Sequence, residues 1–226
     1  MSPPSRPTRF GVAGPRVRRW ILAIGVFGLI GWRIGLVRFW VFSAICLASV
    51  VYMLSIVDPT LMQERLKPAG KSADAGALIT IRLVAAAHVL VTLLDIGGLH
   101  FSDTVPGWLH VAGLAVFAAA LVFLAHAMAA NRFFSTAVRI QDDRGHRVVS
   151  QGPYAVVRHP GYAAMIVAIP ADALGLGSWW GFALALLYAA LIARRVMVED
   201  RFLHENLPGY AEYASRVRYR LVPGVV

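Results

Sequence analysis

Long apolar runs that recur along the chain limit its fold more than any other feature. Six of them are long enough, or nearly so, to cross about 30 Å of hydrocarbon as α-helices. We expect membrane spans at residues 20–37, 39–57, 77–97, 108–130, 160–176 and 179–198. Hydrophobic residues make up 58% of the 226 residues and charged residues only 15%, a composition that excludes an ordinary soluble domain. The sequence therefore predicts an all-α, polytopic integral membrane protein.

The chain begins and ends with polar segments that differ from its apolar middle. Residues 1–19 contain five Arg and no acidic residue, and we interpret them as a basic cytoplasmic arm. Residues 20–226 are expected to form a single membrane domain. Within it, residues 199–219 have an amphipathic helical pattern. Leu207-Pro208-Gly209 should interrupt that helix, because Pro and Gly both disfavour a helix interior.

Lys and Arg are distributed unevenly between the loops. Residues 98–107 contain neither, whereas the N-terminal arm, the 58–75 linker, the 131–158 segment and the C-terminal tail each carry several. Cytoplasmic loops of membrane proteins are enriched in Lys and Arg, so the 98–107 loop is expected outside and the basic segments in the cytoplasm. Arg33 and Arg38 fit this topology poorly. The net charge of +10 has the same origin, and no nucleic-acid partner is expected.

The 131–158 segment is the longest polar stretch of the chain. Its β-prone pieces, residues 136–141 and 146–150, flank a predicted turn at Asp142-Asp143-Arg144-Gly145. It leads into the string Gly152-Pro153-Tyr154-Ala155-Val156-Val157-Arg158-His159-Pro160-Gly161-Tyr162. Charged and aromatic side chains gathered at a membrane boundary are costly and rarely idle, so this string is a candidate site.

The 152–162 string offers groups suited to an anionic ligand. Arg158 supplies a cation, and the amides after Pro160 lie at a helix start, which favours anions. Tyr154 and Tyr162 supply aromatic surfaces. The same residues also suit a plain membrane anchor, in which Arg158 reaches the interface and the two Tyr form an aromatic belt. The residue types alone leave both interpretations open.

A second group of charges follows the last apolar run. Arg195 and Glu199 are four residues apart and therefore share one helix face. A structural salt bridge at a helix end is the simplest interpretation. However, the runs 160–176 and 179–198 are joined by a very short Gly/Ser turn and should form an antiparallel hairpin. The hairpin would bring these charges back beside residues 158–162.

The Arg-His-Pro-x-Tyr string, the apolar hairpin and the acidic pair Glu199-Asp200 together resemble the isoprenylcysteine carboxyl methyltransferase family. That family belongs to a superfamily that includes phospholipid methyltransferases. Its members are integral membrane enzymes that use S-adenosylmethionine, so the resemblance implies this cofactor. The likeness is sharp from residue 131 onward. Asp200 stands where the family has Glu, and Ala164 stands where it often has Gly.

The resemblance also implies roles for individual residues. The candidate cofactor-binding residues are Gln141, His146, Arg147, Val148, Val149, Tyr154, Arg158, His159, Pro160, Gly161, Tyr162 and Asp200. Arg195 matches an Arg that the family associates with the methyl acceptor, and Glu199 matches the first acid of its acidic pair. These two are the candidate catalytic residues. The tail resembles that of the family at Leu203, Leu207, Tyr210 and Tyr213.

The resemblance implies methyl transfer to a lipophilic acceptor at the cytoplasmic face of a membrane. We expect this membrane to be a bacterial inner membrane. Carboxyl O-methylation of an isoprenylcysteine-like substrate is the expected reaction. A carboxylate acceptor needs a cation such as Arg195, whereas an amine acceptor must lose a proton, for which Glu199 is suited. Phospholipid or small-molecule N- or S-methylation therefore stays open, as does a reductase similar to sterol reductases. A non-catalytic scaffold or a transporter-like bundle is the alternative of another class.

The remaining ionisable residues give weaker signals. Cys46 is the single cysteine, which excludes a disulfide within the chain. No His, Cys or carboxylate spacing indicates a metal site. His88 lies singly in an apolar run. Asp95 and Asp172 lie near the outer ends of their spans, where contact with water is expected.

Overall fold

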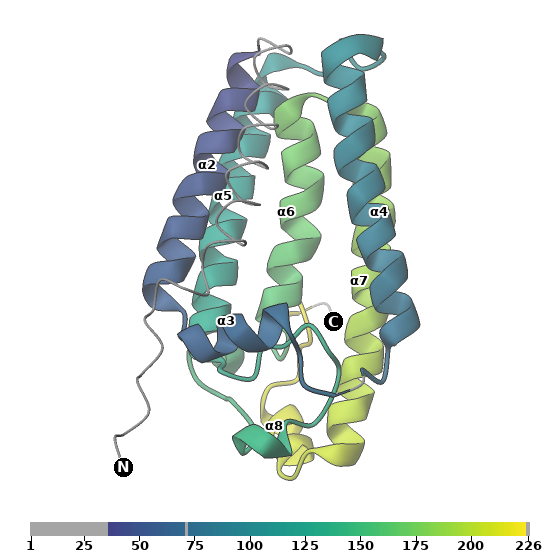
Figure 1. Ribbon diagram of the computed structural model, residues 1–226. Coiled ribbons are helices and arrows are strands. Elements are labelled where there is room, and N and C mark those ends of the chain that lie inside the picture. Colours follow the sequence, from purple (N-terminus) through teal and green to yellow (C-terminus); the bar gives the residue numbers. More distant parts are fainter. Residues whose placement is uncertain (1–35, 71, 225–226) are drawn as a thin grey trace, which may run out of the picture.

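The computed structural model describes residues 36–70 and 72–224, and this part of the chain contains helices and no strands. The long helices of the bundle are α2 (Val37–Ile56), α4 (Ala75–Leu94), α5 (Gly107–Ala130), α6 (Pro160–Leu176) and α7 (Trp179–Asn206). They run up and down side by side, and the short helices α3 (Pro59–Leu66) and α8 (Tyr210–Arg216) lie at one end of the bundle (Figure 1). We call that end the α3/α8 end.

Four of the described helices are long and apolar enough to cross a membrane. They are α2, α5, α7 and the continuous helix of α4 and the π-helical turn η1 (Asp95–Leu99), while α6 is a shorter apolar helix. The prediction of an all-α integral membrane protein is confirmed. The predicted span at residues 20–37 lies outside the described residues. The run predicted at 179–198 is longer than expected, because α7 continues through the charged residues to Asn206.

Local capping sets where several helices begin and end. Asp58 caps α3 by accepting a hydrogen bond from the Thr60 amide at 2.7 Å, and Pro59 occupies the first helical position. Ser178 caps α7 by accepting from the Gly181 amide at 2.9 Å. Between α6 and α7, Gly177 has a φ of 87°, a left-handed conformation that favours glycine. The hairpin turn predicted from the sequence is therefore confirmed.

Glycine also permits the closest helix contacts. A Cβ on Gly113 of α5 would collide with the backbone of Ala171 and Gly175 in α6, and a Cβ on Gly181 of α7 would collide with Thr92 of α4. Close approach of backbones through small residues is the usual way in which membrane helices pack. The hairpin of α6 and α7 is thereby held between α5 and α4.

The polar residues inside the bundle pair with one another. His88 Nε2 lies 2.9 Å from Asp172 Oδ1, and both side chains are buried. Asp95 is also buried and accepts hydrogen bonds from Ser102 and, at 2.6 Å, from Ser178 Oγ. The expected water contact of the two aspartates was wrong. In a medium that offers no hydrogen bonds, protein partners take the place of water.

The two ends of the bundle match the predicted distribution of charge. The Lys- and Arg-free 98–107 segment lies at the end opposite to the 131–158 segment and the tail (Figure 1). Arg38, which fitted this distribution poorly, donates from Nε to the Leu176 carbonyl at 2.6 Å. A cation at the carboxyl end of α6 satisfies a carbonyl that the helix leaves unpaired. Arg33 lies outside the described residues.

The two predicted β-prone pieces do not form strands. Residues 136–141 and 146–150 are irregular, and between them lies a short 3₁₀ helix, η2 (Asp142–Arg144). The predicted turn itself is confirmed, since Gly145 is left-handed and its amide donates to the Asp142 carbonyl at 3.0 Å. The backbone of Val138 bonds instead with Ala73 and the Ser72 hydroxyl group. Local β-propensity was overridden because these groups found partners in the linker before α4.

We predict that Gly113→Ala lowers the free energy of unfolding by about 1–3 kcal/mol, the usual cost of overpacking a close contact. Gly107→Ala, in the same helix, is the control, because its added Cβ would meet no atom within 4 Å. Thermal unfolding of both variants in detergent measures the difference. Equal stability of the two variants would contradict the close approach of α5 and α6.

Candidate active site

The predicted site residues gather around a cavity at the α3/α8 end, which we call the polar cavity. Its walls come from the 131–158 segment, the start of α6, the end of α7 and the region of α8. It is lined by Asn131, Phe134, His146, Arg147, Val148, Tyr154, Arg158, His159, Tyr162, Glu199, Leu203, Leu207, Tyr210 and Tyr213. Segments more than 60 residues apart in the sequence thus meet in one place, as the hairpin argument predicted.

Asp200 lies behind the wall of the polar cavity and holds several segments together. Its carboxylate accepts hydrogen bonds from Arg158 Nε at 2.8 Å, the Tyr210 hydroxyl group at 2.8 Å and Arg220 Nε at 2.8 Å. His159 Nε2 lies 3.2 Å from the same carboxylate. Asp200 is only 3% exposed, and its acceptor positions are taken by these protein groups. Its place in the structure is that of a positioning residue.

Arg158 is engaged in the same network. Its Nη1 donates to the carbonyl groups of Val217 and Arg218, both at 2.8 Å. Its amide and that of His159 donate to the carbonyl groups of Tyr219 and Arg220. The C-terminal segment is thereby fastened across the start of α6. Arg158 also lines the polar cavity, so its role in cofactor binding stays a prediction.

Two tyrosines near this network are protonated hydrogen-bond donors. Burial, together with the charge of Asp200, raises the pKa of Tyr210 far above its ordinary value. Burial likewise raises the pKa of Tyr154, and its buried hydroxyl group lacks a hydrogen bond that satisfies both distance and angle. Burying such a group without a partner costs free energy. The Tyr154 hydroxyl group is therefore available to a molecule in the polar cavity.

His146 forms another part of the wall. Its ring lies on Phe133, with 4.6 Å between the ring centroids. Burial, followed by the charge of Arg139, lowers the pKa of His146 to about 4, so the ring is neutral at physiological pH. The Gln141 amide donates to Nδ1 at 3.3 Å, which leaves the proton on Nε2. His146 thus offers an uncharged aromatic face and one N–H donor.

The other candidates in this region have packing roles. Gln141 is buried and bonds to the Phe133 carbonyl and to Arg144. Pro160 is buried at the first position of α6. Gly161 packs so tightly that an added Cβ would collide with the Phe134 ring. Val149 is half-buried and does not line the cavity. These residues support the wall rather than face its interior.

Arg195 and Glu199 do not form the direct salt bridge that their spacing suggested. Arg195 Nε donates to the Tyr162 hydroxyl group at 3.0 Å, and this hydroxyl group donates to Glu199 Oε2 at 2.6 Å. Arg195 also donates from Nη2 to the Thr136 carbonyl at 2.7 Å. Its buried Nη1 forms an ion pair with Asp74 Oδ2 at 3.7 Å, although neither of these two atoms makes a hydrogen bond. Tyr162 therefore links the two candidate catalytic residues.

A second cavity, which we call the apolar groove, lies between α4, α6 and α7. It is lined by Arg65, Leu78, Ile81, Phe134, Ser135, Thr136, Tyr162, Met165, Tyr188, Ile192 and Arg195. Phe134 and Tyr162 also line the polar cavity. Arg195 therefore belongs to the apolar groove, whereas Glu199 belongs to the polar cavity, and Tyr162 stands between them.

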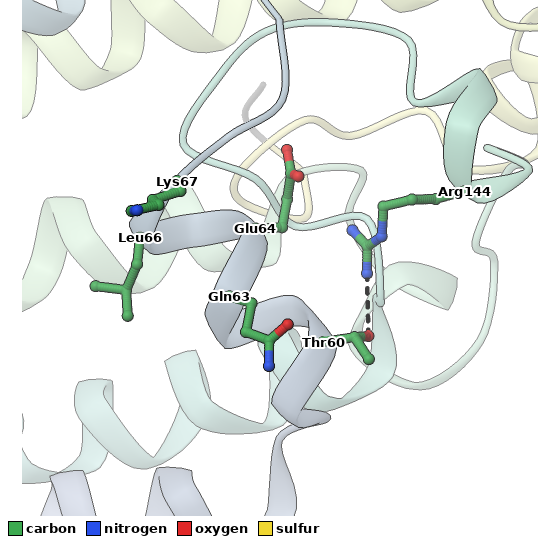
Figure 2. Close-up of a pocket in the computed structure, with 6 residues that line it drawn as sticks. All are labelled: Thr60, Gln63, Glu64, Leu66, Lys67 and Arg144. Atoms are coloured by element: carbon green, nitrogen blue, oxygen red, sulfur yellow. Dashed lines mark hydrogen bonds between the residues drawn. The ribbon is translucent and has the colours of Figure 1, made fainter. Parts of the chain in front are cut away.

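A third cavity lies on the surface of α3. Figure 2 shows its lining residues, with Arg144 reaching Thr60 at 3.4 Å. It contains none of the predicted site residues. Glu64 is one of its lining residues and accepts hydrogen bonds from Arg139 and Ser135. Helix α3 is thereby tied to the 131–158 segment.

Sequence reasoning missed several residues that shape these cavities. Arg220 and Asp74 carried no strong local signal, because each acts through a contact with a distant segment. A half-buried tail arginine opposite a buried aspartate becomes visible only after the chain has folded.

Comparison with known proteins agrees with this geometry. Residues 111–205, from α5 to the end of α7, match the isoprenylcysteine carboxyl methyltransferase family. Over these residues the chain is similar to this family. The match covers the α6–α7 hairpin and most of the polar cavity, and the recognition made from the Arg-His-Pro-x-Tyr string is confirmed.

The individual relatives that this chain resembles are distant. A cobalt-zinc-cadmium resistance protein, CzcN, of Cupriavidus metallidurans is 35% identical over 85 residues, which are 35% of this chain and 38% of the relative. Protein-S-isoprenylcysteine O-methyltransferase B of Arabidopsis thaliana is 27% identical over 90 residues, 39% of this chain and 46% of the relative. A probable protein-S-isoprenylcysteine O-methyltransferase of Oryza sativa subsp. indica is 28% identical over 90 residues. The matches thus span less than half the length of these relatives.

We predict that Asp200→Asn lowers the free energy of unfolding by about 3–5 kcal/mol, because it leaves the buried Arg158 without its counter-ion. Asp143→Asn is the matched control, since Asp143 pairs with Arg139 at 2.8 Å but its side chain is 51% exposed. Removing that pair should cost no more than about 1 kcal/mol. Thermal unfolding compares the two. Similar small losses in both variants would contradict the central position of Asp200.

Proposed function

We propose that this protein is an integral membrane methyltransferase that uses S-adenosylmethionine and methylates a lipophilic acceptor. Two cavities of different character carry this proposal. They are neighbours, because Phe134 and Tyr162 line both of them. The polar cavity suits a charged, water-soluble cofactor. The apolar groove suits an acceptor with a hydrocarbon chain. The similarity of residues 111–205 to the methyltransferase family supports this division.

The polar cavity has groups that fit the cofactor. Arg147 lines it and, among the described residues, forms no ion pair or hydrogen bond, so it is our candidate for the cofactor carboxylate. Glu199 can hold the ammonium group, and the Tyr154 hydroxyl group can donate a hydrogen bond to the cofactor. His146 and Leu203 offer flat and apolar surfaces for a purine ring. When bound, S-adenosylmethionine supplies an electrophilic methyl group.

Arg195 is suited to hold the acceptor. Its buried Nη1 pairs with Asp74 at 3.7 Å but makes no hydrogen bond, and Arg195 lines a largely apolar groove. An anionic head group attached to a hydrocarbon chain would satisfy both surroundings. A carboxylate is already ionised at neutral pH and needs no general base. We therefore propose carboxyl O-methylation of an isoprenylcysteine-like acceptor.

The chain's contribution to the transfer is then mainly orientation. Methyl transfer requires the acceptor oxygen and the methyl carbon to be held in line, and such positioning supplies much of the rate. Tyr162 holds Arg195 through its hydroxyl group and is itself held by Glu199. Glu199, which lines the polar cavity, thus orients Arg195 through the Tyr162 hydroxyl group. The charge distribution supports an orientation with the α3/α8 end in the cytoplasm, as in a bacterial inner membrane.

An amine acceptor, such as a phospholipid head group, is the second candidate. Asp74 favours it, because its buried Oδ2 makes no hydrogen bond and pairs with Arg195, a lining residue of the groove, at 3.7 Å. A carboxylate in that place can accept a proton from an amine. Transfer to a phosphatidylethanolamine vesicle and not to a prenylated cysteine analogue would favour this reaction.

We predict that the purified protein binds S-adenosylmethionine and that Arg147→Gln weakens binding by about 1.5–3 kcal/mol, the usual loss for a charge-assisted hydrogen bond. Calorimetric titration measures the affinity. Arg201→Gln is the control, because Arg201 is exposed on α7 and lines neither cavity. Absence of binding, or preference for a reduced nicotinamide cofactor, would overturn the proposal.

We predict that Arg195→Gln lowers kcat/KM for a prenylated cysteine analogue roughly tenfold to a hundredfold, as expected for a lost hydrogen bond to a charged group. Cofactor affinity should change little, since Arg195 does not line the polar cavity. The exposed neighbour Arg194 gives the control Arg194→Gln. Unchanged turnover with only a lowered melting temperature would return Arg195 to a structural role.

A further inference from the structure

The wall between the two cavities consists of two aromatic side chains. Phe134 and Tyr162 are the residues that line both the polar cavity and the apolar groove, and their ring centroids lie 6.5 Å apart. Every other lining residue belongs to one cavity. Any contact between a molecule in the polar cavity and one in the apolar groove must therefore pass between or beside these two rings.

The two rings are held in different ways. Tyr162 is buried, and its hydroxyl group is bonded to both Arg195 and Glu199. These two hydrogen bonds fix the hydroxyl end of the ring. Phe134 is half-buried and has no polar group to bond. A phenyl ring held by packing alone turns more easily than one tied by two hydrogen bonds, so Phe134 is the adjustable half of the wall.

The surroundings of Phe134 keep its ring in the wall. Gly161 lies against the ring so closely that an added Cβ would collide with it. The Arg65 guanidinium carbon lies 4.9 Å from the ring centroid, and Arg65 Nη1 donates to the Phe134 carbonyl at 3.2 Å. A cation over a ring face is attracted by the electron density of that face. Helix α3 therefore holds both the backbone and the ring of Phe134.

We propose that the Phe134 ring is the partition that keeps the two ligands apart until both are bound and then sets how they meet. This rests on the proposed function, because it takes the polar cavity as the cofactor site and the apolar groove as the acceptor site. Reacting atoms must come within about 3–3.5 Å, so the wall must be thin at one point. Gly161 leaves the space that the ring needs, and Arg65 limits how far it turns.

The partition determines specificity as well as access. A full phenyl ring at position 134 excludes hydrocarbon chains of the groove from the polar cavity. A smaller side chain would join the two cavities and admit acceptors whose head groups are larger. Phe134 is thus a specificity-determining residue that neither the Arg-His-Pro-x-Tyr string nor the acidic pair includes.

The test measures access to the polar cavity from the lipid side, without requiring methyl transfer. A thiol reporter is placed by Leu203→Cys in a Cys46→Ser background, because Leu203 lines the polar cavity and not the apolar groove. The protein in liposomes is treated with a maleimide that partitions into lipid or with a charged, membrane-impermeant maleimide. Mass spectrometry gives the two labelling rates.

Adding Phe134→Ala should raise the rate with the lipid-soluble reagent by at least about tenfold, equivalent to ~1.4 kcal/mol in the free energy of access. The rate with the charged reagent should change less than about twofold. Phe133→Ala is the matched control, since Phe133 stacks on His146 and lines neither cavity. Phe134→Leu keeps most of the packing and serves if the Ala variant does not fold.

Two results would overturn the partition. One is an unchanged rate with the lipid-soluble reagent in a folded Phe134 variant. The other is an equal rise in the Phe133 control. The proposed function is tested separately by cofactor binding and transfer in the chain without these changes. If transfer occurs, Phe134→Leu should lower kcat for a prenylated cysteine analogue more than it raises the KM for S-adenosylmethionine, because the cofactor keeps its other contacts.

Discussion

The buried carboxylate of Asp200 is the interaction on which the rest of the site depends. A charge in this position is costly unless several donors compensate it, and here Arg158, Arg220, Tyr210 and His159 surround it. These donors come from the start of α6, from α8 and from the tail. The need to compensate the charge of Asp200 thus brings together the segments that close the polar cavity on the side of the tail.

The α6–α7 hairpin turns this network into a site with two faces. The hairpin places Tyr162 opposite Arg195 and Glu199, so its hydroxyl group connects a cation in the apolar groove with a carboxylate in the polar cavity. Glycine contacts on both sides keep the hairpin close to its neighbours. A lipophilic acceptor and a water-soluble cofactor can then approach one another from a hydrocarbon side and an aqueous side.

Two polar pairs inside the bundle connect its helices away from the α3/α8 end. His88 with Asp172, and Asp95 with Ser178, connect α4 and its π-helical turn to the hairpin. Such pairs add less stability than their short distances suggest, because the helices outside the folded bundle also find partners. Their clearer consequence is register: each side chain can be satisfied at only one relative position of the helices. The position of Tyr162 and Arg195 at the other end follows from that register.

The sequence by itself determined the all-helical membrane fold, the position of most apolar helices, the hairpin, the helix break at Leu207-Pro208-Gly209 and the resemblance to the family. These features depend on local composition and on motifs within a few residues. Only the tertiary structure decided which charges pair. Asp200 pairs with Arg158 and Arg220, Tyr162 links Arg195 to Glu199, and Phe134 stands between two cavities. The β-prone pieces failed for the same reason, since a hydrogen bond to a distant segment outweighs a weak local preference.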